Sequence, residues 1–402
     1  MKILWVKAGK LLPVDTGGKI RSYNILRHLA RKHAVTLLSY YGGQPDPDYD
    51  RSLREHLPGA HTIHTAAPEG GLSQRLDYIR HLPSRAPYAV QKFTHPAVRR
   101  TVTQWLQQRR FDVAVCDFLS ASLNFPHPLP SPCVLFQHNV ETVLWRRMAQ
   151  TETSLFHKLS YNIEAVKMER YERQALQRFH RVIAVSQQDG DEMLKLDSTC
   201  QITVVPTGVD TGQYQVAPPA LATPPVIVFV GSMDWEPNID AVEYFCRQMW
   251  PTILAASPGA RFQIVGRNPH PRVQALKSSS VEVTGTVPSV PEFLRSATVV
   301  VVPLRIGGGT RLKIFEAMAM GKAVVSTTIG AEGLDVTPGR DLILADDPER
   351  FAAAIIDLIR DSALRRKYEQ AAAILAAHYD WSEIATSFAE VLRQAVASFS
   401  AG

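Results

Sequence analysis

The chain is poor in cysteine and contains no long hydrophobic run. Its four cysteines, Cys116, Cys133, Cys200 and Cys246, show no C-x-x-C spacing. This argues against a disulfide framework or a cysteine zinc site and predicts reduced thiols. The longest apolar runs, such as residues 297–304, are much shorter than the ~20 residues of a membrane-spanning helix. The first residues lack the apolar core of a secretory signal, so we expect a cytoplasmic protein.

The composition is also far from that of a disordered or fibrous protein. Hydrophobic residues make up 45% and charged residues 20% of the 402 residues, as in soluble globular chains. The net charge of +6 is uneven, with 27 basic and 18 acidic residues before Pro206 but 17 and 20 from there on. A basic half suggests contact with a nucleic acid, an anionic membrane or a phosphorylated substrate. The alternative is a basic surface that only contacts solvent. Nucleic acid is disfavoured, because no helix-turn-helix, zinc or RNA-binding aromatic signature is present.

Short apolar runs alternate with amphipathic helical segments in both halves of the chain. This alternation predicts parallel sheets in an α/β fold, with two doubly wound, Rossmann-like domains. The predicted strands are residues 3–6, 35–38, 112–116, 133–136 and 181–185, then 226–230, 261–265, 281–283, 298–302, 323–326 and 342–345.

A Pro/Ala-rich segment marks the boundary between the two predicted domains. Residues 217–225 (APPALATPP) resist both helix and sheet, so we expect domains at 1–210 and 226–385 with a linker at 211–225. A terminal helical stretch is predicted from residue 362 to about residue 399. Its last part, residues 386–402, is expected to form a separate helix. One arrangement consistent with the sequence is that this helix packs against the first domain.

The strongest candidate site is the segment GGGTRLKIFE, which follows a predicted strand. Its glycines allow backbone amides to approach a ligand closely, and Thr310 is a candidate helix N-cap. The helix start, together with Arg311 and Lys313, suits a diphosphate. Glu316 suits the vicinal hydroxyls of a ribose. The alternative is a plain glycine turn before a helix with a Lys–Glu pair. The three glycines are Gly307, Gly308 and Gly309.

Several segments together resemble GT-B glycosyltransferases, specifically the retaining group called family 4. They occur in the family's order and span nearly the whole chain. The resemblance implies two Rossmann-like domains facing across a cleft, and transfer of a sugar from a nucleotide diphosphate to a hydroxyl acceptor with retention and without a metal or other cofactor. The segments are the stretch of residues 307–334, HNVE (138–141), VIAVS (182–186), VPTGVD (205–210), VGSMDWEPNIDAVEYF (230–245) and GGKIRSYNILRHLA (17–30).

The resemblance also implies roles for individual residues. Glu316 matches the glutamate that holds the ribose, and Arg311 and Lys313 would neutralise the diphosphate. His138 would lie beside the anomeric centre and act by hydrogen bonding and electrostatics rather than as a nucleophile. Other implied donor-binding residues are Gly17, Gly18, Gly231, Arg267, Val287, Gly307, Gly308, Gly309 and Thr310.

Two departures from the family pattern affect the donor site. Gly308 stands where the family usually has a second glutamate that touches the sugar, which leaves the sugar's identity open. Ser232 and Asn238 follow the strand at 226–230, where many relatives carry an Arg and a Lys for the phosphates. Binding of the donor phosphates would therefore depend more on Arg311 and Lys313 in this chain than in those relatives.

Acceptor-side candidates are fewer. Asp117 follows a predicted strand and would bind an acceptor hydroxyl, unless it only caps a loop. Glu141 would orient neighbouring groups, unless it is an ordinary acidic residue in a first helical turn. The acceptor would be a saccharide, a lipid-linked molecule or a small molecule. The basic helical segment 146–181 would contact the inner face of a membrane peripherally, or else be a salt-bridged surface helix.

Other functions remain open at this stage. One alternative is a nucleotide-sugar epimerase or hydrolase on the same fold, and another is a non-catalytic nucleotide-sugar-binding subunit. A nicotinamide dehydrogenase is disfavoured, because the first strand–helix loop lacks the G-x-G-x-x-G fingerprint.

Overall fold

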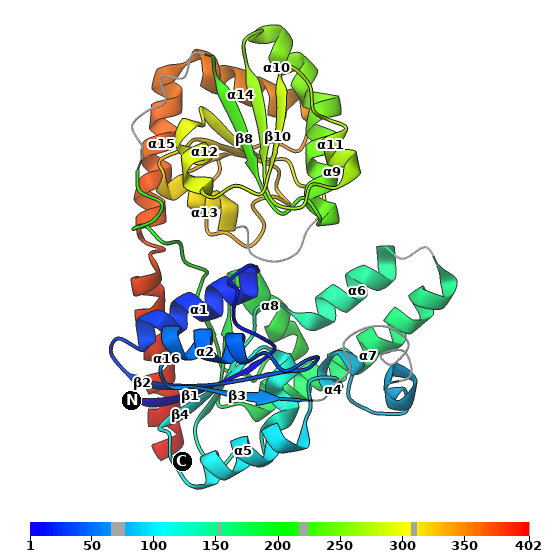
Figure 1. Ribbon diagram of the computed structural model, residues 1–402, viewed down its shortest axis with the longest axis vertical. Helices are drawn as coiled ribbons and strands as arrows, with labels where there is room; N and C mark the ends of the chain where they lie inside the picture. The colour runs from blue at the N-terminus through cyan, green and yellow to red at the C-terminus, as the bar shows by residue number, and fades with distance from the viewer. Residues whose placement is uncertain (66–76, 152–153, 217–223, 307–311, 402) are drawn as a thin grey trace. The chain divides into compact units, whose positions relative to one another are not determined.

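The computed structural model describes residues 1–65, 77–151, 154–216, 224–306 and 312–401 (Figure 1). The chain divides into two compact units. The first unit consists of Met1–Pro206 together with Ser382–Gly402, and the second consists of Thr207–Trp381. Each unit is built around one parallel sheet, as the alternating pattern of the sequence predicts.

The first unit contains a seven-stranded sheet in the order β3-β2-β1-β4-β5-β6-β7, and every recorded pair is parallel. The sequence predicted five of these strands but missed β3 and β7. Both are edge strands whose residues are largely half-buried or exposed, so neither shows the continuous apolar run of a central strand. The strands are β1 (Lys2–Ala8), β2 (Ala34–Tyr41), β3 (Ala60–His64), β4 (Val113–Asp117), β5 (Cys133–Phe136), β6 (Arg181–Ala184) and β7 (Ile202–Val204).

Helices cover both faces of this sheet, with α1 and α2 on one face and α5 on the other (Figure 1). Alternate residues of β1 therefore enter two different cores. Leu4 and Val6 pack in the core that includes Val98 and Val102 of α5. The helices of the first unit are α1 (Gly17–Leu29), α2 (Pro47–His56), α4 (Tyr88–Gln91), α5 (Pro96–Gln107), η1 (Leu119–Asn124), α6 (Glu141–Thr151), α7 (Leu155–Arg178), α8 (Gln187–Leu196) and α16 (Trp381–Ala401).

The last helix, α16, completes the core of the first unit. Phe388 is fully buried, and its ring centroid lies 5.3 Å from that of Trp5 and 5.0 Å from that of Phe136. The indole of Trp5 and the ring of Phe388 are stacked, so a strand at one end of the chain and a helix at the other share one hydrophobic cluster.

The second unit contains a six-stranded parallel sheet in the order β10-β9-β8-β11-β12-β13. All six strands coincide with predicted apolar runs, because each strand is short and contains valine or isoleucine, and the central strands β8 and β11 are mostly buried. They are β8 (Val226–Val230), β9 (Arg261–Val265), β10 (Val281–Gly285), β11 (Val299–Val302), β12 (Val324–Ser326) and β13 (Ile343–Leu344). The helices are α9 (Glu236–Tyr244), η2 (Phe245–Met249), α10 (Trp250–Ala256), α11 (Pro271–Gln274), α12 (Val290–Ser296), α13 (Leu312–Ala319), α14 (Pro348–Arg360) and α15 (Ser362–Ala377).

The predicted terminal helical stretch contains two helices, and the second begins five residues earlier than the predicted boundary at 386. α15 ends at Ala377 and α16 begins at Trp381. Between them, Asp380 forms a parallel β-bridge with Val209, whose amide donates to the Tyr379 carbonyl at 2.8 Å. This pairing requires an extended backbone, so the helix cannot continue through residue 380.

Both sheets reverse their strand order at one point, between β1 and β4 in the first unit and between β8 and β11 in the second. Ligands of open α/β sheets bind beyond the carboxyl ends of the strands at such a switch point. We therefore expect the functional residues to lie where these four strands end.

Candidate functional site

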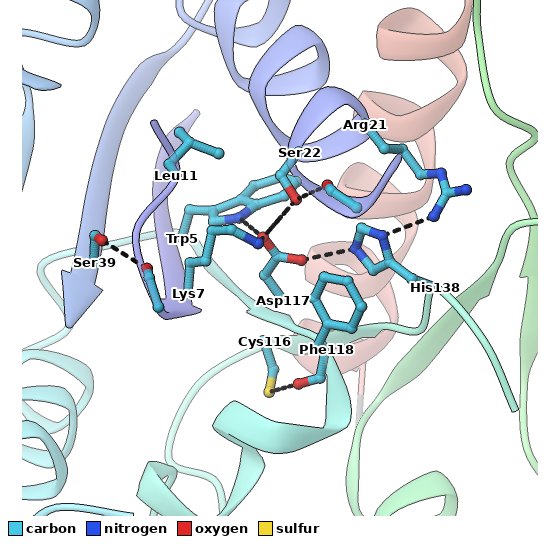
Figure 2. Close-up of polar contacts among 12 residues, drawn as sticks. Trp5, Lys7, Leu11, Arg21, Ser22, Ser39, Cys116, Asp117, Phe118 and His138 are labelled. Carbon is cyan, nitrogen blue, oxygen red and sulfur yellow. Dashed lines mark hydrogen bonds and ion pairs between the residues drawn. The ribbon is translucent and has the colours of Figure 1, made fainter. Parts of the chain in front are cut away.

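The carboxylate of Asp117, at the end of β4, is the centre of a buried polar cluster in the first unit (Figure 2). Its Oδ2 accepts hydrogen bonds from Trp5 Nε1 at 2.9 Å, Lys7 Nζ at 3.0 Å and Ser22 Oγ at 2.7 Å. Its Oδ1 accepts from His138 Nε2 at 2.8 Å. Four donors occupy this carboxylate, and its side chain is fully buried. Asp117 thus positions Lys7 and His138 rather than exposing an oxygen to an acceptor hydroxyl.

His138, which follows β5, is held from both sides of its ring. Since a carboxylate only accepts, Nε2 carries the proton donated to Asp117, and Nδ1 accepts from Arg21 Nη1 at 2.8 Å. The ring of Phe118 is stacked on the imidazole, with centroids 3.7 Å apart and planes 7° apart. The tautomer and the orientation of His138 are therefore both fixed by the protein.

Burial controls the ionisation of this cluster. It lowers the pKa of His138 to about 3, against the opposing effect of the Asp117 carboxylate. Burial alone would raise the pKa of Asp117, but the charge of Lys7 and the hydrogen bond from His138 hold that pKa below its usual range. At neutral pH the site therefore contains a neutral imidazole and an ionised carboxylate.

The start of α1 lies against this cluster. A Cβ built on Gly18 would lie 2.5 Å from Cζ of Phe118 and 3.7 Å from Nδ1 of His138. No side chain fits at Gly18 unless the phenyl ring moves. A Cβ on Gly17 would meet nothing within 4 Å. Of the two predicted glycines, only Gly18 is required by close approach.

A second buried carboxylate, Glu172 of α7, holds the loop that carries His138. It accepts from Gln137 Nε2 at 2.8 Å, from the amides of Glu141 and Thr142 at 3.0 and 2.8 Å, and from Thr142 Oγ1 at 2.5 Å. It thus acts as an N-terminal cap for α6, supplied by another helix. Burial, and then the charge of Glu172, raises the pKa of Glu141 to about 7. Sequence patterns did not identify Glu172 as a cap, because it lies 31 residues after the backbone amide that it caps.

A cavity of about 680 Å³ lies beside the polar cluster, entirely within the first unit. Lys7, Gly18 and Phe118 line it, whereas Asp117, His138 and Glu141 are not among its lining residues. The cavity is also lined by three further lysines, Lys10, Lys19 and Lys92, and by four further aromatic residues, Tyr40, Tyr41, Tyr88 and Phe93.

In the second unit, Lys313 of α13 lies at the end of β8. Its Nζ donates to Asn238 Oδ1 at 2.9 Å and lies 4.3 Å from the ring centroid of Phe229. A Cβ on Gly231 would come within 2.9 Å of the Lys313 Nζ and 2.7 Å of Asn238 Nδ2, so a side chain there would displace these two groups. Gly231, Asn238 and Lys313 thus meet at the switch point of the second sheet.

Glu316 lies one turn further along α13. It forms a hydrogen bond with the hydroxyl of Tyr214, a residue that the sequence analysis did not identify. Burial raises the pKa of Glu316, and the Tyr214 hydrogen bond and the charge of Lys313 oppose that rise. Tyr214 lies 102 positions earlier, outside every quoted motif, so only the fold brings the two together.

Two further predicted donor residues lie at neighbouring strand ends. Arg267 follows β9, and its Nε donates to Ser232 Oγ at 2.9 Å. Val287 is half-buried just after β10. Ser232 and Asn238, which stand where many relatives carry an Arg and a Lys, therefore contact Arg267 and Lys313 respectively. The remaining predicted residues, Gly307, Gly308, Gly309, Thr310 and Arg311, lie outside the part of the chain that the structure describes.

Two family models match the chain. Residues 16–213 match the model described as "Glycosyltransferase Family 4", and residues 224–361 match "Glycosyl transferases group 1". Together they cover most of both structural units.

Curated relatives are distant in sequence. A 44.6 kDa protein of the cps region of Klebsiella pneumoniae is 23% identical over 262 residues, 62% of this chain and 66% of that protein, just under two thirds of its length. A phosphatidyl-myo-inositol mannosyltransferase of Mycolicibacterium smegmatis is 26% identical over 309 residues, 74% of each chain.

Solved structures share the fold over nearly the whole chain. A sucrose-phosphate synthase from Thermosynechococcus elongatus has a TM-score of 0.71 at 17% identity, covering 99% of this chain and 100% of that one. HepE from Anabaena, in complex with UDP, has a TM-score of 0.67 at 16% identity, covering 98% and 100%. The two α/β units therefore form a GT-B fold. Among the described helices, none has both the length and the apolar character needed to cross a bilayer.

Proposed function

Because the chain belongs to the glycosyltransferases of the group 1 and family 4 type, we propose that it moves a sugar from a nucleotide diphosphate to a hydroxyl acceptor with retention of the anomeric configuration. The observation that carries this proposal is the placement of Lys313 and Glu316 one turn apart at the switch point of the second sheet. In a nucleotide-sugar donor, the anionic diphosphate and the two ribose hydroxyls lie about as far apart as Lys313 and Glu316 do on α13.

On the donor side, Lys313 would neutralise the diphosphate, assisted by Arg311, and Glu316 would accept hydrogen bonds from the ribose. The Tyr214 hydroxyl holds the Glu316 carboxyl in place. Neutralising a leaving group in a water-poor site contributes on the order of 3 kcal/mol to the transition state. These side chains provide the charge that a metal ion would otherwise supply, which supports a metal-independent reaction.

The polar cluster of the first unit supports retention of the anomeric configuration without a nucleophile from the protein. Both ring nitrogens of His138 are engaged, and all four hydrogen bonds of Asp117 come from the protein. Neither group has a lone pair directed at an anomeric carbon. In the proposed step, the acceptor oxygen forms a bond to the anomeric carbon while the bond between that carbon and the diphosphate oxygen breaks. The electron pair stays on the diphosphate, which takes the acceptor's proton.

The test uses the full chain with a panel of uridine, guanosine and thymidine diphosphate sugars. Lys313→Ala and Glu316→Ala should each lower kcat/KM by roughly 10²–10³-fold. The melting temperature should change little. Lys277→Ala removes an exposed lysine of the same unit and serves as the matched control. Unchanged kinetics in both site variants would defeat the assignment.

Product analysis separates transfer from its alternatives. A hydrolase releases free sugar and an epimerase alters the donor, both without an acceptor. A non-catalytic subunit binds donor and turns over nothing. Glycoside formation that requires a saccharide, lipid-linked or small-molecule acceptor supports the transferase.

Peripheral contact with an anionic membrane is proposed for α7. Leu159, Ile163 and Val166 are 62%, 42% and 50% exposed and recur at helical spacing on one face, next to the exposed Lys158. Vesicles containing anionic lipid should bind the wild-type chain and release a Leu159→Ser/Val166→Ser variant. Equal binding of both proteins would contradict the contact.

A further inference from the structure

Resting on the proposed glycosyl transfer, we infer that the cavity of the first unit receives the acceptor and that this acceptor carries a phosphate group. The cavity is entered by four lysines from three parts of the unit: Lys7 of β1 and Lys10 just after it, Lys19 of α1, and Lys92 just after α4. A volume of about 680 Å³ suits a small molecule or a lipid headgroup.

Three of these lysines form ion pairs with aspartates that do not line the cavity. Lys7 bonds Asp117 at 3.0 Å, Lys10 bonds Asp46 at 2.8 Å, and Lys19 bonds Asp15 at 3.0 Å. An ammonium group has three donors. Lys7 Nζ also donates to Ser22 Oγ at 3.4 Å, and Lys19 Nζ also donates to the Pro13 carbonyl at 3.2 Å, so each of these two lysines keeps one donor for a ligand. Lys10 keeps two donors beyond its bond to Asp46 among the described contacts.

Lys92 differs from the other three. It is exposed, its Nζ lies 5.0 Å from the ring centroid of Phe93, and it has no ion pair among the described residues. A phosphate provides several oxygens over a small volume and so can be shared between ammonium groups that arrive from separate elements. Lys10 and Lys92 flank the cavity from different elements and are the clearest candidates.

The cavity offers almost no negative charge to oppose such a ligand. Asp77 is its one acidic lining residue among those described. It already accepts from the Tyr88 hydroxyl at 3.0 Å and pairs with His81 at 3.4 Å. Among the described lining residues, four of the five charged side chains other than histidine are lysines. They would repel a cationic acceptor and attract an anionic one.

The aromatic residues suit the rest of such a molecule. The hydroxyl of Tyr40 accepts from Asn124 Nδ2 at 2.9 Å, and that of Tyr41 donates to Asp50 Oδ1 at 3.2 Å. With their polar ends occupied, these residues offer apolar ring surface, which suits the carbon framework of a sugar or polyol. A phosphorylated polyol or sugar matches both the lysines and the rings.

The transfer step does not consume the phosphate. A hydroxyl elsewhere on the acceptor forms the bond to the anomeric carbon, and its proton leaves with the nucleotide diphosphate, as in the step above. The acceptor phosphate acts only as the group by which the lysines hold the molecule.

The test measures binding to the full chain by calorimetry. The probes are glucose 6-phosphate and inositol 1-phosphate, each compared with its unphosphorylated parent, and vesicles with or without phosphatidylinositol. At least one phosphorylated probe should bind at least tenfold more tightly than its parent, and this preference should shrink as salt is added. Lys10→Gln and Lys92→Gln should remove most of the preference. Lys195→Gln, which alters a surface lysine on α8, should not.

The outcomes identify which idea fails. Binding of the soluble phosphates points to a free acceptor and supports the inference. Binding of phosphatidylinositol vesicles alone supports it, as a lipid headgroup, when Lys10→Gln or Lys92→Gln weakens that binding. Vesicle binding that both variants retain belongs to α7 and overturns the inference. Equal affinity for neutral and phosphorylated probes, or full affinity in both site variants, overturns it. Donor turnover that persists in that case leaves the proposed function standing. Tight phosphate binding without any transfer would defeat the proposed function alone.

Discussion

The carboxylate of Asp117 and the imidazole of His138 are joined by a 2.8 Å hydrogen bond at the ends of neighbouring strands β4 and β5. This bond sets which ring nitrogen carries the proton, and Arg21 on the opposite nitrogen completes the arrangement. The first unit therefore contains a rigid polar core directly beneath its cavity.

Removing the charge of Asp117 should destabilise the protein strongly. Asp117→Asn leaves Lys7 without its buried counter-ion, and breaking such a pair costs roughly 3–5 kcal/mol. Urea denaturation measures the loss. Asp112→Asn, at an exposed carboxylate that accepts only the Lys2 amide, is the control and should change the free energy of unfolding by about 0.5 kcal/mol or less. A similar effect of both variants would contradict the role of Asp117.

His138 should make the protein less stable as the pH falls. Its pKa is lowered to about 3 in the folded state, so between about pH 6.5 and 3 the unfolded chain binds more protons than the native one. Relative to His138→Gln, the wild type should lose up to ~1.4 kcal/mol per pH unit across that range. Urea denaturation at pH 4.5, 5.5 and 7.5 tests this, and parallel curves for the two proteins would refute it.

Glu141 should have the opposite pH dependence. Its pKa is raised to about 7, so the native state holds a proton that the unfolded chain releases near pH 4.5. Relative to Glu141→Gln, the wild type should lose stability as the pH rises from about 4.5 to about 7, by about 3 kcal/mol in total. The same denaturation series measures it. Glu55→Gln, at an exposed glutamate, should show no such trend.

The adjacent glycines at the start of α1 provide a matched pair. Gly18→Ala places a methyl group 2.5 Å from the Phe118 ring and should destabilise the protein by about 1–3 kcal/mol while displacing the ring from His138. Gly17→Ala meets no neighbour within 4 Å and should be neutral or slightly stabilising. Thermal unfolding and initial rates check both variants. Tolerance of alanine at residue 18 would show that the ring is free to move.

Tyr214 should affect donor binding through Glu316. Tyr214→Phe keeps the ring but removes the hydroxyl that bonds the carboxyl, which should weaken donor binding by roughly tenfold, about 1.4 kcal/mol. Binding of uridine diphosphate sugars, read as a thermal shift, measures this. Tyr23→Phe, at a residue of α1 in the other unit, is the control. Equal donor affinity in all three proteins would exclude Tyr214 from the site.

Sequence patterns predicted the strands well where an apolar run was continuous, as in β8 and β11, but missed β3 and β7 at the edges of the first sheet, whose residues are largely half-buried or exposed. They also identified residues at strand ends, including Asp117 and His138, because strand ends in parallel sheets lie together. They could not identify partners, since Trp5 and Lys7 meet Asp117 across 112 and 110 positions. They placed the start of the last helix at 386 rather than 381, because the break at Asp380 depends on a bridge to Val209 rather than on any local signal.

The packing of Phe388 on Trp5 has a consequence for how the protein is made. The first unit includes residues from both ends of the described chain, whereas the second is continuous in sequence. On a translating ribosome, residues 207–381 are therefore complete before α16 emerges. The first unit is translated first, but its core is completed last. Until α16 has been translated, Phe388 cannot pack on Trp5, and this side of the sheet lacks its covering helix.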